Sequence, residues 1–255
     1  MKNNPKKLPL AETFVSIQGE GNYAGKKVVF IRFSGCDFRC AWCDSKYTHM
    51  VTDETEYLNT DALLLRVREV NGEGVINNSG RNADHIVITG GNPALYDLEE
   101  FVVGLHEMGM KVHIETQGSK WPSWLKYVDN VVFSPKPPSS KMKVNQLWLA
   151  NKINEFAKYK MINKEVIVKI PIFDDIDYDW AKMFYTMLDM SNINHYFLSV
   201  GNHNPHGDDE TRNVVEGVLN GYAWLVDKVL KDNEYTNISV LPQIHTLLWG
   251  NMTGV

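Results

Sequence analysis

Cys36-Asp37-Phe38-Arg39-Cys40-Ala41-Trp42-Cys43 contains all 3 cysteines of this 255-residue chain. Their spacing is C-x3-C-x2-C, within a segment that is too short to fold by itself. Three thiols so close together cannot all form disulfides with one another, because one thiol is always left over. They suit a metal centre better, since soft thiolates typically bind an iron–sulfur cluster or zinc.

The number of cysteines bears on the kind of metal centre. Electron-transfer 4Fe-4S clusters commonly use four cysteines, and this chain has no fourth. One iron of such a cluster would lack a protein ligand and could bind a small molecule. This pattern resembles the radical S-adenosylmethionine enzymes, whose motif reads C-x3-C-x-aromatic-C, with Trp42 at the aromatic position. The alternative is a closed structural zinc site of the three cysteines and His49, although this cysteine spacing is unusual for zinc.

Composition and charge indicate a globular enzyme-sized domain rather than a nucleic-acid or membrane protein. The formal net charge is -5, so no global basic field points to direct nucleic-acid binding. No apolar run approaches the length of a membrane span, and no apolar signal segment follows the basic N-terminus. Closely spaced cysteines without such a segment favour a reducing, cytoplasmic compartment.

Apolar runs along the chain predict strands that alternate with helices. The expected strands cover residues 8–16, 28–34, 85–89, 111–116, 130–134, 165–173, 195–200 and 237–241. The expected helices cover residues 59–70, 97–110, 145–159, 177–190 and 211–231. Between the first helix and the next strand, residues 71–84 are polar and are interpreted as a surface loop.

This alternation is typical of βα units around a parallel sheet. About six parallel strands after residue 27 are too few for a closed eight-stranded barrel, so the predicted fold is α/β, a partial (β/α) barrel formed as one domain by residues 1–255. Ligands of parallel sheets bind at the carboxyl ends of the strands. The cysteine loop and residues 89–93, 115–117 and 134–136 all follow strands, and we expect them to line one site.

Arg32 lies inside the apolar strand that leads into the cysteine loop. A charge in such a run should have a partner, because burying an unpaired charge is costly. Glu12, Glu20 or an anionic ligand could each be that partner.

Several motifs resemble the 7-carboxy-7-deazaguanine synthase family of radical S-adenosylmethionine enzymes over nearly the whole chain. They are Ile17-Gln18-Gly19-Glu20-Gly21, Arg32, the cysteine loop with Asp44-Ser45, Thr89-Gly90-Gly91-Asn92-Pro93, Glu115-Thr116-Gln117-Gly118, Ser134-Pro135-Lys136-Pro137-Pro138 and Gln243-Ile244-His245-Thr246. The resemblance implies a carbon–nitrogen lyase of queuosine (preQ0) biosynthesis. Its reaction converts 6-carboxy-5,6,7,8-tetrahydropterin to 7-carboxy-7-deazaguanine with loss of ammonia. Two positions depart from the pattern: Asn92 stands where many superfamily members have Glu, and Ser45 where many relatives have Thr.

The resemblance also implies the roles of the site residues. Cys36, Cys40 and Cys43 would hold the 4Fe-4S cluster, and Ser45 would bind Mg²⁺. S-adenosylmethionine would be contacted by Trp42, Cys43, Asp44, Gly91, Glu115, Gln117, Ser134, Pro135, Lys136, Asp174 and Asp175. The pterin would be contacted by Ile17, Gln18, Gly19, Glu20, Arg32, Thr89 and His245. By their chemistry, Glu20 can accept hydrogen bonds from a guanidine-like ring edge and Arg32 can donate to a carboxylate.

The apolar character of Leu247, Leu248 and Trp249 predicts that the tail, residues 243–255, packs down and caps the site. The resemblance further implies a homodimer, an electron donor such as flavodoxin or ferredoxin, and a product that feeds tRNA or DNA modification. Two alternatives stay open: a glycyl-radical activating enzyme, which would need a protein partner, and a zinc-stabilised binding module without catalysis. His203, His206 and Asp208 are interpreted as a solvated loop rather than a metal site.

Overall fold

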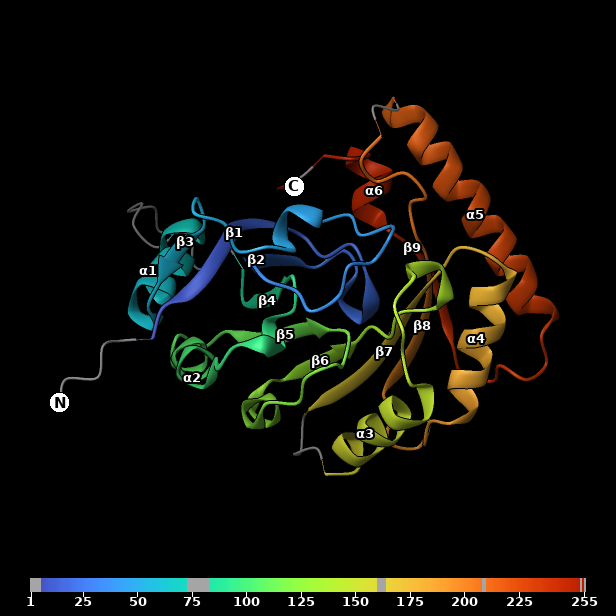
Figure 1. Ribbon diagram of the computed structural model, residues 1–255, viewed down its shortest axis with the longest axis horizontal. Helices are drawn as coiled ribbons and strands as arrows, with labels where there is room; N and C mark the ends of the chain where they lie inside the picture. The colour runs from blue at the N-terminus through green and yellow to red at the C-terminus, as the bar shows by residue number, and fades with distance from the viewer. Residues whose placement is uncertain (1–5, 73–82, 160–163, 208–209, 253, 255) are drawn as a thin grey trace.

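The computed structural model describes residues 6–72, 83–159, 164–207, 210–252 and 254. Within these residues, one curved sheet of nine strands has the order β3-β1-β2-β4-β5-β6-β7-β8-β9 (Figure 1). The parallel strands are β2 Lys27–Phe33, β4 His85–Gly90, β5 Lys111–Thr116, β6 Asn130–Phe133, β7 Glu165–Ile172, β8 His195–Val200 and β9 Ser239–Pro242. β1, Leu8–Ile17, runs antiparallel to β2, and β3, Glu56–Leu58, runs antiparallel to β1.

This sheet confirms the predicted partial (β/α) barrel. β3 and β9 stand at opposite edges of the strand order, so the described sheet is not closed. It has seven parallel strands (β2 and β4 to β9) where about six were expected. The sequence did not predict β3, because three residues are too few to show an alternating pattern. The expected polar loop, residues 71–84, lies mostly outside the described residues.

Helices cover the outer face of the sheet in Figure 1. They are α1 Thr60–Val70, α2 Glu99–Glu107, α3 Gln146–Lys158, α4 Asp175–Thr186 and α5 Thr211–Lys231. The short α6, Ile244–Trp249, follows β9 and contributes His245 and Thr246 to the lining of the cavity described below. The main apolar core joins side chains of α2, such as Phe101 and Leu105, to outward-facing strand residues such as Ile86, Ile88 and Ile114. Among the described residues, no helix is both long enough and apolar enough to span a bilayer.

Two helices, α2 and α4, differ from the sequence prediction by more than one residue at each end. α4 begins at Asp175 instead of residue 177, because the side chain of Asp174 accepts a hydrogen bond of 2.8 Å from the Asp177 N–H and caps the helix. α2 is shorter than the predicted 97–110. It ends before Gly109, whose φ of +71° is the left-handed conformation typical of a helix stop.

Strand alternation divides the inside of the barrel into layers. The middle layer is apolar and contains Val28, Phe30 and Val87 on one side and Val132, Ile167 and Phe197 on the other. Near the amino ends of the strands lies a bonded polar layer, formed by His85, His113, Asn130 and Glu165 with Asn22 and Tyr23. Near the carboxyl ends, a second polar layer of Arg32, Thr89, Glu115, Ser134 and Lys169 lines a cavity. The polar layer at the carboxyl ends of the strands is therefore the one that lines the cavity of the candidate site.

Candidate functional site

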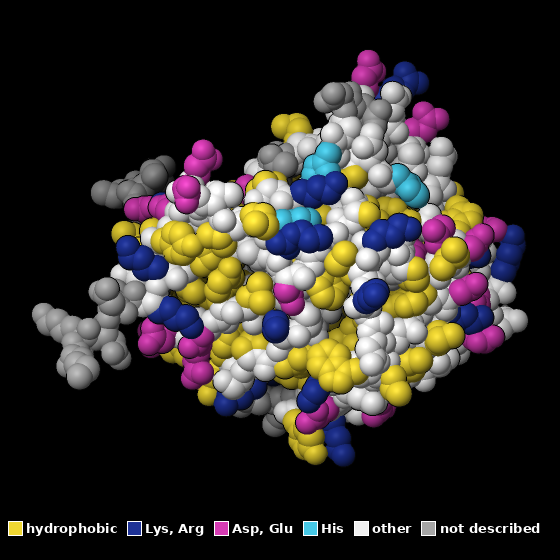
Figure 2. All heavy atoms as spheres, viewed as in Figure 1, with side chains coloured by type: hydrophobic (Ala, Val, Ile, Leu, Met, Phe, Trp, Pro, Cys, Tyr) yellow, Lys and Arg dark blue, Asp and Glu magenta, His cyan; other side chains and the backbone are white. Residues whose placement is uncertain are grey.

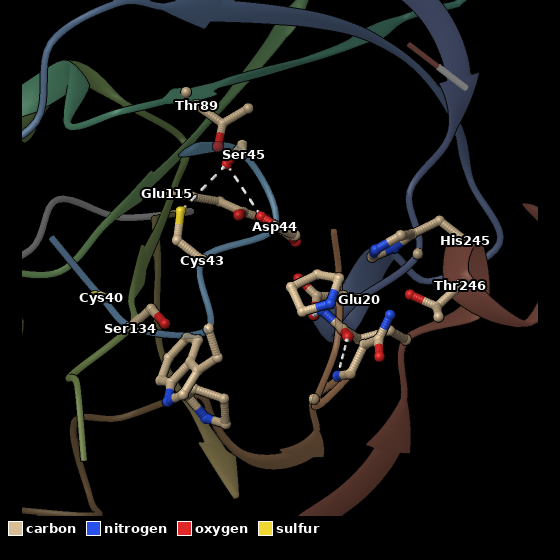
Figure 3. Close-up of a pocket in the computed structure, with 18 of the residues that line it drawn as sticks. Glu20, Cys40, Cys43, Asp44, Ser45, Thr89, Glu115, Ser134, His245 and Thr246 are labelled. Atoms are coloured by element: carbon tan, nitrogen blue, oxygen red, sulfur yellow. Dashed lines mark hydrogen bonds between the residues drawn. The ribbon is translucent and has the colours of Figure 1, made fainter. Parts of the chain in front are cut away.

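The carboxyl ends of the parallel strands surround an open cavity. Figure 3 shows Cys43, Asp44, Ser45, Thr89 and Glu115 on one side of it, and Glu20, His245 and Thr246 on the opposite side. The expected site residues that line it are Ile17, Gln18, Gly19, Glu20, Arg32, Cys36, Cys40, Trp42, Cys43, Asp44, Ser45, Thr89, Gly91, Glu115, Gln117, Ser134, Lys136 and His245. The fold thus gathers segments from the first turn to the C-terminal tail.

Three expected cofactor residues are not brought to the cavity. Pro135 is buried, and its neighbours Ser134 and Lys136 line the wall instead. Asp174 uses its carboxylate to cap α4, and Asp175 is exposed and pairs with Lys228 of α5. Neither Asp174 nor Asp175 lines the cavity, and Phe173, which directly follows β7, lines it instead, so a cofactor contact at the two aspartates stays a prediction.

The three cysteines are free thiols on one wall of this cavity. Burial raises the pKa of Cys36 and Cys40, and burial together with the Asp44 carboxylate raises the pKa of Cys43 to about 11. At neutral pH these thiols stay protonated unless a bound cation stabilises the thiolate, as a metal centre does. The donor set therefore fits a metal cluster.

The zinc alternative places a stricter demand on the same residues. A single zinc ion needs its ligands within about 2.3 Å of one point. In the described part of the chain, no three His, Cys, Asp or Glu side chains converge in this way, although His49 also lines the cavity. A cluster makes no such demand, because each cysteine binds a different iron.

The cysteine loop is held from outside by two neighbouring loops. The indole N–H of Trp42 donates to Ser139 Oγ at 2.8 Å, and its ring stacks on Phe173 with centroids 4.7 Å apart. The Ala41 N–H donates to the carbonyl of Ser140 at 3.0 Å. The aromatic position of the motif thus fixes the loop against the ends of β6 and β7.

The cysteine loop and the residues that follow it, between β2 and β3, also form part of the molecular surface. Lys, Arg and His side chains gather in the middle of the face where Figure 1 places this segment (Figure 2). Arg39 and Lys46 are exposed residues of the segment. The guanidinium of Arg39 folds back onto its own loop and donates to the carbonyls of Cys36 and Phe38.

Ser45 and Asp44 form a pair of oxygen donors beside the last cysteine. The buried Ser45 hydroxyl donates to Asp44 Oδ1 at 3.0 Å and lies 3.8 Å from Cys43 Sγ (Figure 3). Hydroxyl and carboxylate oxygens are ligands that Mg²⁺ prefers.

The glycine pair of the Thr89–Pro93 motif packs against the chain itself. A Cβ atom on Gly91 would lie 2.1 Å from the carbonyl oxygen of Gly35, and Gly90 has a φ of +116°. The next residue, Asn92, is fully buried, and its amide donates to Asp37 Oδ1 and Ser119 Oγ at 3.0 Å each. The motif therefore anchors the start of the cysteine loop to the end of β4.

Arg32 has an acidic partner, and that partner is Glu12. Its Nε lies 3.0 Å from Glu12 Oε1, but the N–H has no aligned hydrogen-bond acceptor among the described residues. The guanidinium lies 5.6 Å and 5.8 Å from the ring centroids of Phe14 and Phe30. The charge is thus paired with Glu12, and the Arg32 side chain lines the cavity.

Glu20 pairs with Lys169 instead of Arg32. Lys169 is buried and also lies 3.5 Å from Glu115 Oε2. The sequence analysis missed Lys169, although a lysine within the apolar run 165–173 is the same signal that identified Arg32. Its partners could not be found from the sequence because they come from distant strands.

The C-terminal tail contacts the turn after β1. The Ile244 N–H donates to the Gly19 carbonyl at 3.1 Å, and a Cβ atom on Gly19 would lie 2.5 Å from His245 Nδ1. The glycine is needed here because the histidine lies directly against the main chain.

The loop 201–207 connects this tail to the cysteine loop. Asn202 donates to Asn251 Oδ1 at 2.6 Å, and the amide of Asn251 donates to the carbonyls of Asn204 and Gly207. His206 Nε2 donates to the Cys43 carbonyl at 2.6 Å. The interpretation as a solvated loop is therefore incomplete: the loop is exposed at His203 and His206 but bonded on both sides. Asp208 lies outside the described residues.

Known proteins of one name match this chain over nearly its full length, although no family model matches it. The chain is 38% identical over 253 residues to 7-carboxy-7-deazaguanine synthase of Bacillus cereus, covering 98% of this chain and 99% of that protein. It is 35% identical over 254 residues to the enzyme of the same name from Bacillus subtilis, again covering 98% and 99%.

Solved structures share the fold. Escherichia coli QueE has a TM-score of 0.59 at 22% identity, covering 94% of this chain and 95% of that chain. Streptococcus suis SuiB bound to S-adenosylmethionine has a TM-score of 0.51 at 13% identity, covering 80% of this chain and 48% of that chain.

Proposed function

The chain belongs to the 7-carboxy-7-deazaguanine synthase family, and on this premise we propose that it is a radical S-adenosylmethionine lyase that converts 6-carboxy-5,6,7,8-tetrahydropterin to 7-carboxy-7-deazaguanine with release of ammonia. The observation that carries the proposal is one cavity that is lined by the three cysteines and by Arg32, with Glu20 and His245 on the side opposite Cys43. A cofactor site and a site for a polar, anionic heterocycle would thus share a single space.

Cys36, Cys40 and Cys43 would hold the 4Fe-4S cluster. When bound, the cluster and S-adenosylmethionine supply the radical that takes a hydrogen atom from the substrate. The chain's own task is to bind and orient both ligands. Glu115, Gln117, Ser134 and Lys136 line the same cavity and would hold the cofactor, together with Trp42, Asp44 and Gly91.

Arg32 and Glu20 would bind opposite chemical features of the pterin. The Arg32 guanidinium lines the cavity and would donate hydrogen bonds to the substrate carboxylate. The carboxylate of Glu20 would accept N–H bonds from the ring edge that resembles a guanidine. The remaining sides of the pterin would be contacted by Thr89, His245 and the turn Ile17–Gly19.

Ser45 would be the protein's ligand to Mg²⁺. A single hydroxyl is a weak magnesium site, but Asp44 Oδ1 lies 3.0 Å from it and could contribute a second oxygen. Mg²⁺ normally keeps several waters and takes oxygens from the substrate. Metal and substrate should therefore bind cooperatively.

The remaining elements of the proposal rest on family resemblance. Residues 1–255 would act as one domain in a cytoplasmic homodimer, with the tail 243–255 capping the site. Flavodoxin or ferredoxin would supply electrons, and the product would feed queuosine formation in tRNA or another 7-deazapurine.

The decisive experiment is anaerobic reconstitution with iron and sulfide, followed by turnover of the carboxypterin with S-adenosylmethionine, Mg²⁺ and a reductant. Mass spectrometry should detect 7-carboxy-7-deazaguanine and stoichiometric ammonia, and Cys40→Ala should lose the brown cluster and the product together. Ala41→Ser, at the exposed neighbouring position, should keep both. Cofactor cleavage only with an added protein substrate would instead identify an activating enzyme. A colourless zinc protein would identify a binding module.

A further inference from the structure

Lys169 is a buried cation at the floor of the cavity. Its residue is 6% exposed, and it is the one lysine classed as buried within the described ranges. It lies on β7 and is one of the residues that line the cavity. A lysine at such a place must be paired, because desolvation would otherwise drive it to its neutral form.

Two carboxylates share this one ammonium. Glu20, from the turn after β1, makes a direct ion pair and hydrogen bond with Lys169 Nζ. Glu115 on β5 lies 3.5 Å away on the other side. An ammonium has three N–H donors and can serve both at once. The trio therefore carries one negative charge more than positive.

Two glutamines complete the arrangement. Gln18 Nε2 donates to Glu115 Oε1 at 3.2 Å, and Gln243 Nε2 donates to Glu20 Oε1 at 3.1 Å. The network thus joins the turn after β1, β5, β7 and the C-terminal tail. It crosses from the side assigned to the cofactor to the side assigned to the pterin.

We propose that Lys169 is a positioning residue that serves both subsites, keeping Glu20 ionised and turned toward the pterin while fixing Glu115 on the cofactor side. The proposal rests on the proposed function, since it takes Glu20 as the pterin acceptor and Glu115 as a cofactor contact. Lys169 itself need not touch either ligand. Its effect on substrate passes through the charge of Glu20.

The charges around Glu20 explain why Lys169 controls the protonation of that carboxylate. Burial alone would raise the pKa of Glu20, but Lys169 first, and then His245 of the tail, lower that pKa to about 2. Glu115 and Asp44 are the other charged groups that act on Lys169. Without Lys169, burial would dominate, and Glu20 would take up a proton at a higher pH. A protonated carboxyl loses acceptor capacity for two parallel N–H donors.

The test is equilibrium binding of the carboxypterin to reconstituted holoenzyme with S-adenosylmethionine but without reductant, so that no turnover occurs. Each variant is compared with wild type at every pH between about pH 6 and pH 8.5, because other groups of the site and the pterin itself can also titrate. Relative to wild type, Lys169→Met should bind much more weakly at the acid end, recovering by up to about tenfold per pH unit as Glu20 ionises. Lys169→Arg keeps the charge and should follow the wild-type profile.

Lys152→Met is the matched control, because Lys152 lies on α3 and pairs with Glu155 at the surface. A Lys169→Met profile parallel to that of wild type would overturn the proposal, as would loss of binding in Lys169→Arg. The arginine variant keeps the proposal testable if the methionine variant does not fold. Wild-type protein that binds no pterin at any pH would instead refute the proposed function.

Discussion

His206 Nε2 lies 2.6 Å from the main-chain oxygen of Cys43, although 163 residues separate the two along the chain. The contact joins the loop after β8 to the last cysteine of the motif. Through Asn202 and Asn251 the same loop is bonded to the C-terminal tail. The tail and the cysteine loop are therefore mechanically linked across the mouth of the cavity.

We expect His206→Ala to loosen the cysteine loop without unfolding the protein. One hydrogen bond is worth about 0.5–1.5 kcal/mol, so the reconstituted cluster should be lost roughly two- to tenfold faster in the presence of a chelator. Absorbance of the cluster measures this rate. His195→Ala is the control, because His195 is exposed at the start of β8, the opposite end of the same strand. An unchanged rate in His206→Ala would show that the contact is incidental.

Arg32→Ala should weaken the pterin far more than S-adenosylmethionine. A hydrogen bond to a charged group is worth about 1.5–3 kcal/mol, which corresponds to roughly 10- to 150-fold in the dissociation constant. Calorimetry with each ligand separates the two effects. If the folded variant binds the pterin normally, Arg32 serves only as the structural partner of Glu12.

Gly19→Ala should reproduce the effect of His245→Ala. The added Cβ atom would lie 2.5 Å from His245 Nδ1, so the imidazole must leave its place. Both variants should keep the fold and the cluster but lose pterin turnover, measured as product formed per cluster. Gly217→Ala on α5, where an added Cβ meets nothing within 4 Å, should behave as wild type. Normal turnover in His245→Ala would show that the tail only covers the core and that His245 does not bind the pterin.

Chelation of divalent metal should reduce turnover, and millimolar Mg²⁺ should restore it. Ser45→Ala should need more Mg²⁺ for half-maximal rate, because only Asp44 and the substrate would remain as oxygen ligands. Titration of the rate with Mg²⁺ at several pterin concentrations tests the expected cooperativity. Equal rates of turnover with chelator and with Mg²⁺ would show that the reaction does not need the metal.

Acid should destabilise the barrel through His113. Burial and the neighbouring His85 lower the pKa of His113 to about 3. The unfolded chain, whose histidines titrate near pH 6.5, binds more protons than the folded one below that pH. Stability should therefore fall as the pH drops from about 6.5 toward 3, by up to about 1.4 kcal/mol per pH unit.

Melting temperatures of His113→Phe against pH test this expectation. The phenyl ring can keep the packing on Tyr23, whose ring centroid lies 4.4 Å away, and it cannot take up a proton. The variant should show a shallower loss of stability in acid than wild type, whereas the exposed His195→Phe should not. Parallel curves for wild type and His113→Phe would place the acid-sensitive group elsewhere.

The sequence by itself determined the periodic features of this protein. Alternating apolar runs gave seven parallel strands where about six were expected, and Thr211–Lys231 forms the predicted helix without a change of bounds. The cysteine loop and the polar residues after each strand could be assigned to one end of the sheet, because parallel strands put their carboxyl ends together. These properties depend on local spacing, which the sequence displays directly.

Only the tertiary structure decided how the charged residues pair. Arg32 pairs with Glu12, and Glu20 pairs with Lys169. Asp174 caps a helix, and His206 donates a hydrogen bond to the cysteine loop. Apart from the local cap at Asp174, each partner comes from another element of the fold, and a charge selects among partners by distance and burial, which no spacing rule contains. The residue types were visible in the chain, but the geometry that gives them a role exists only after the sheet has curved.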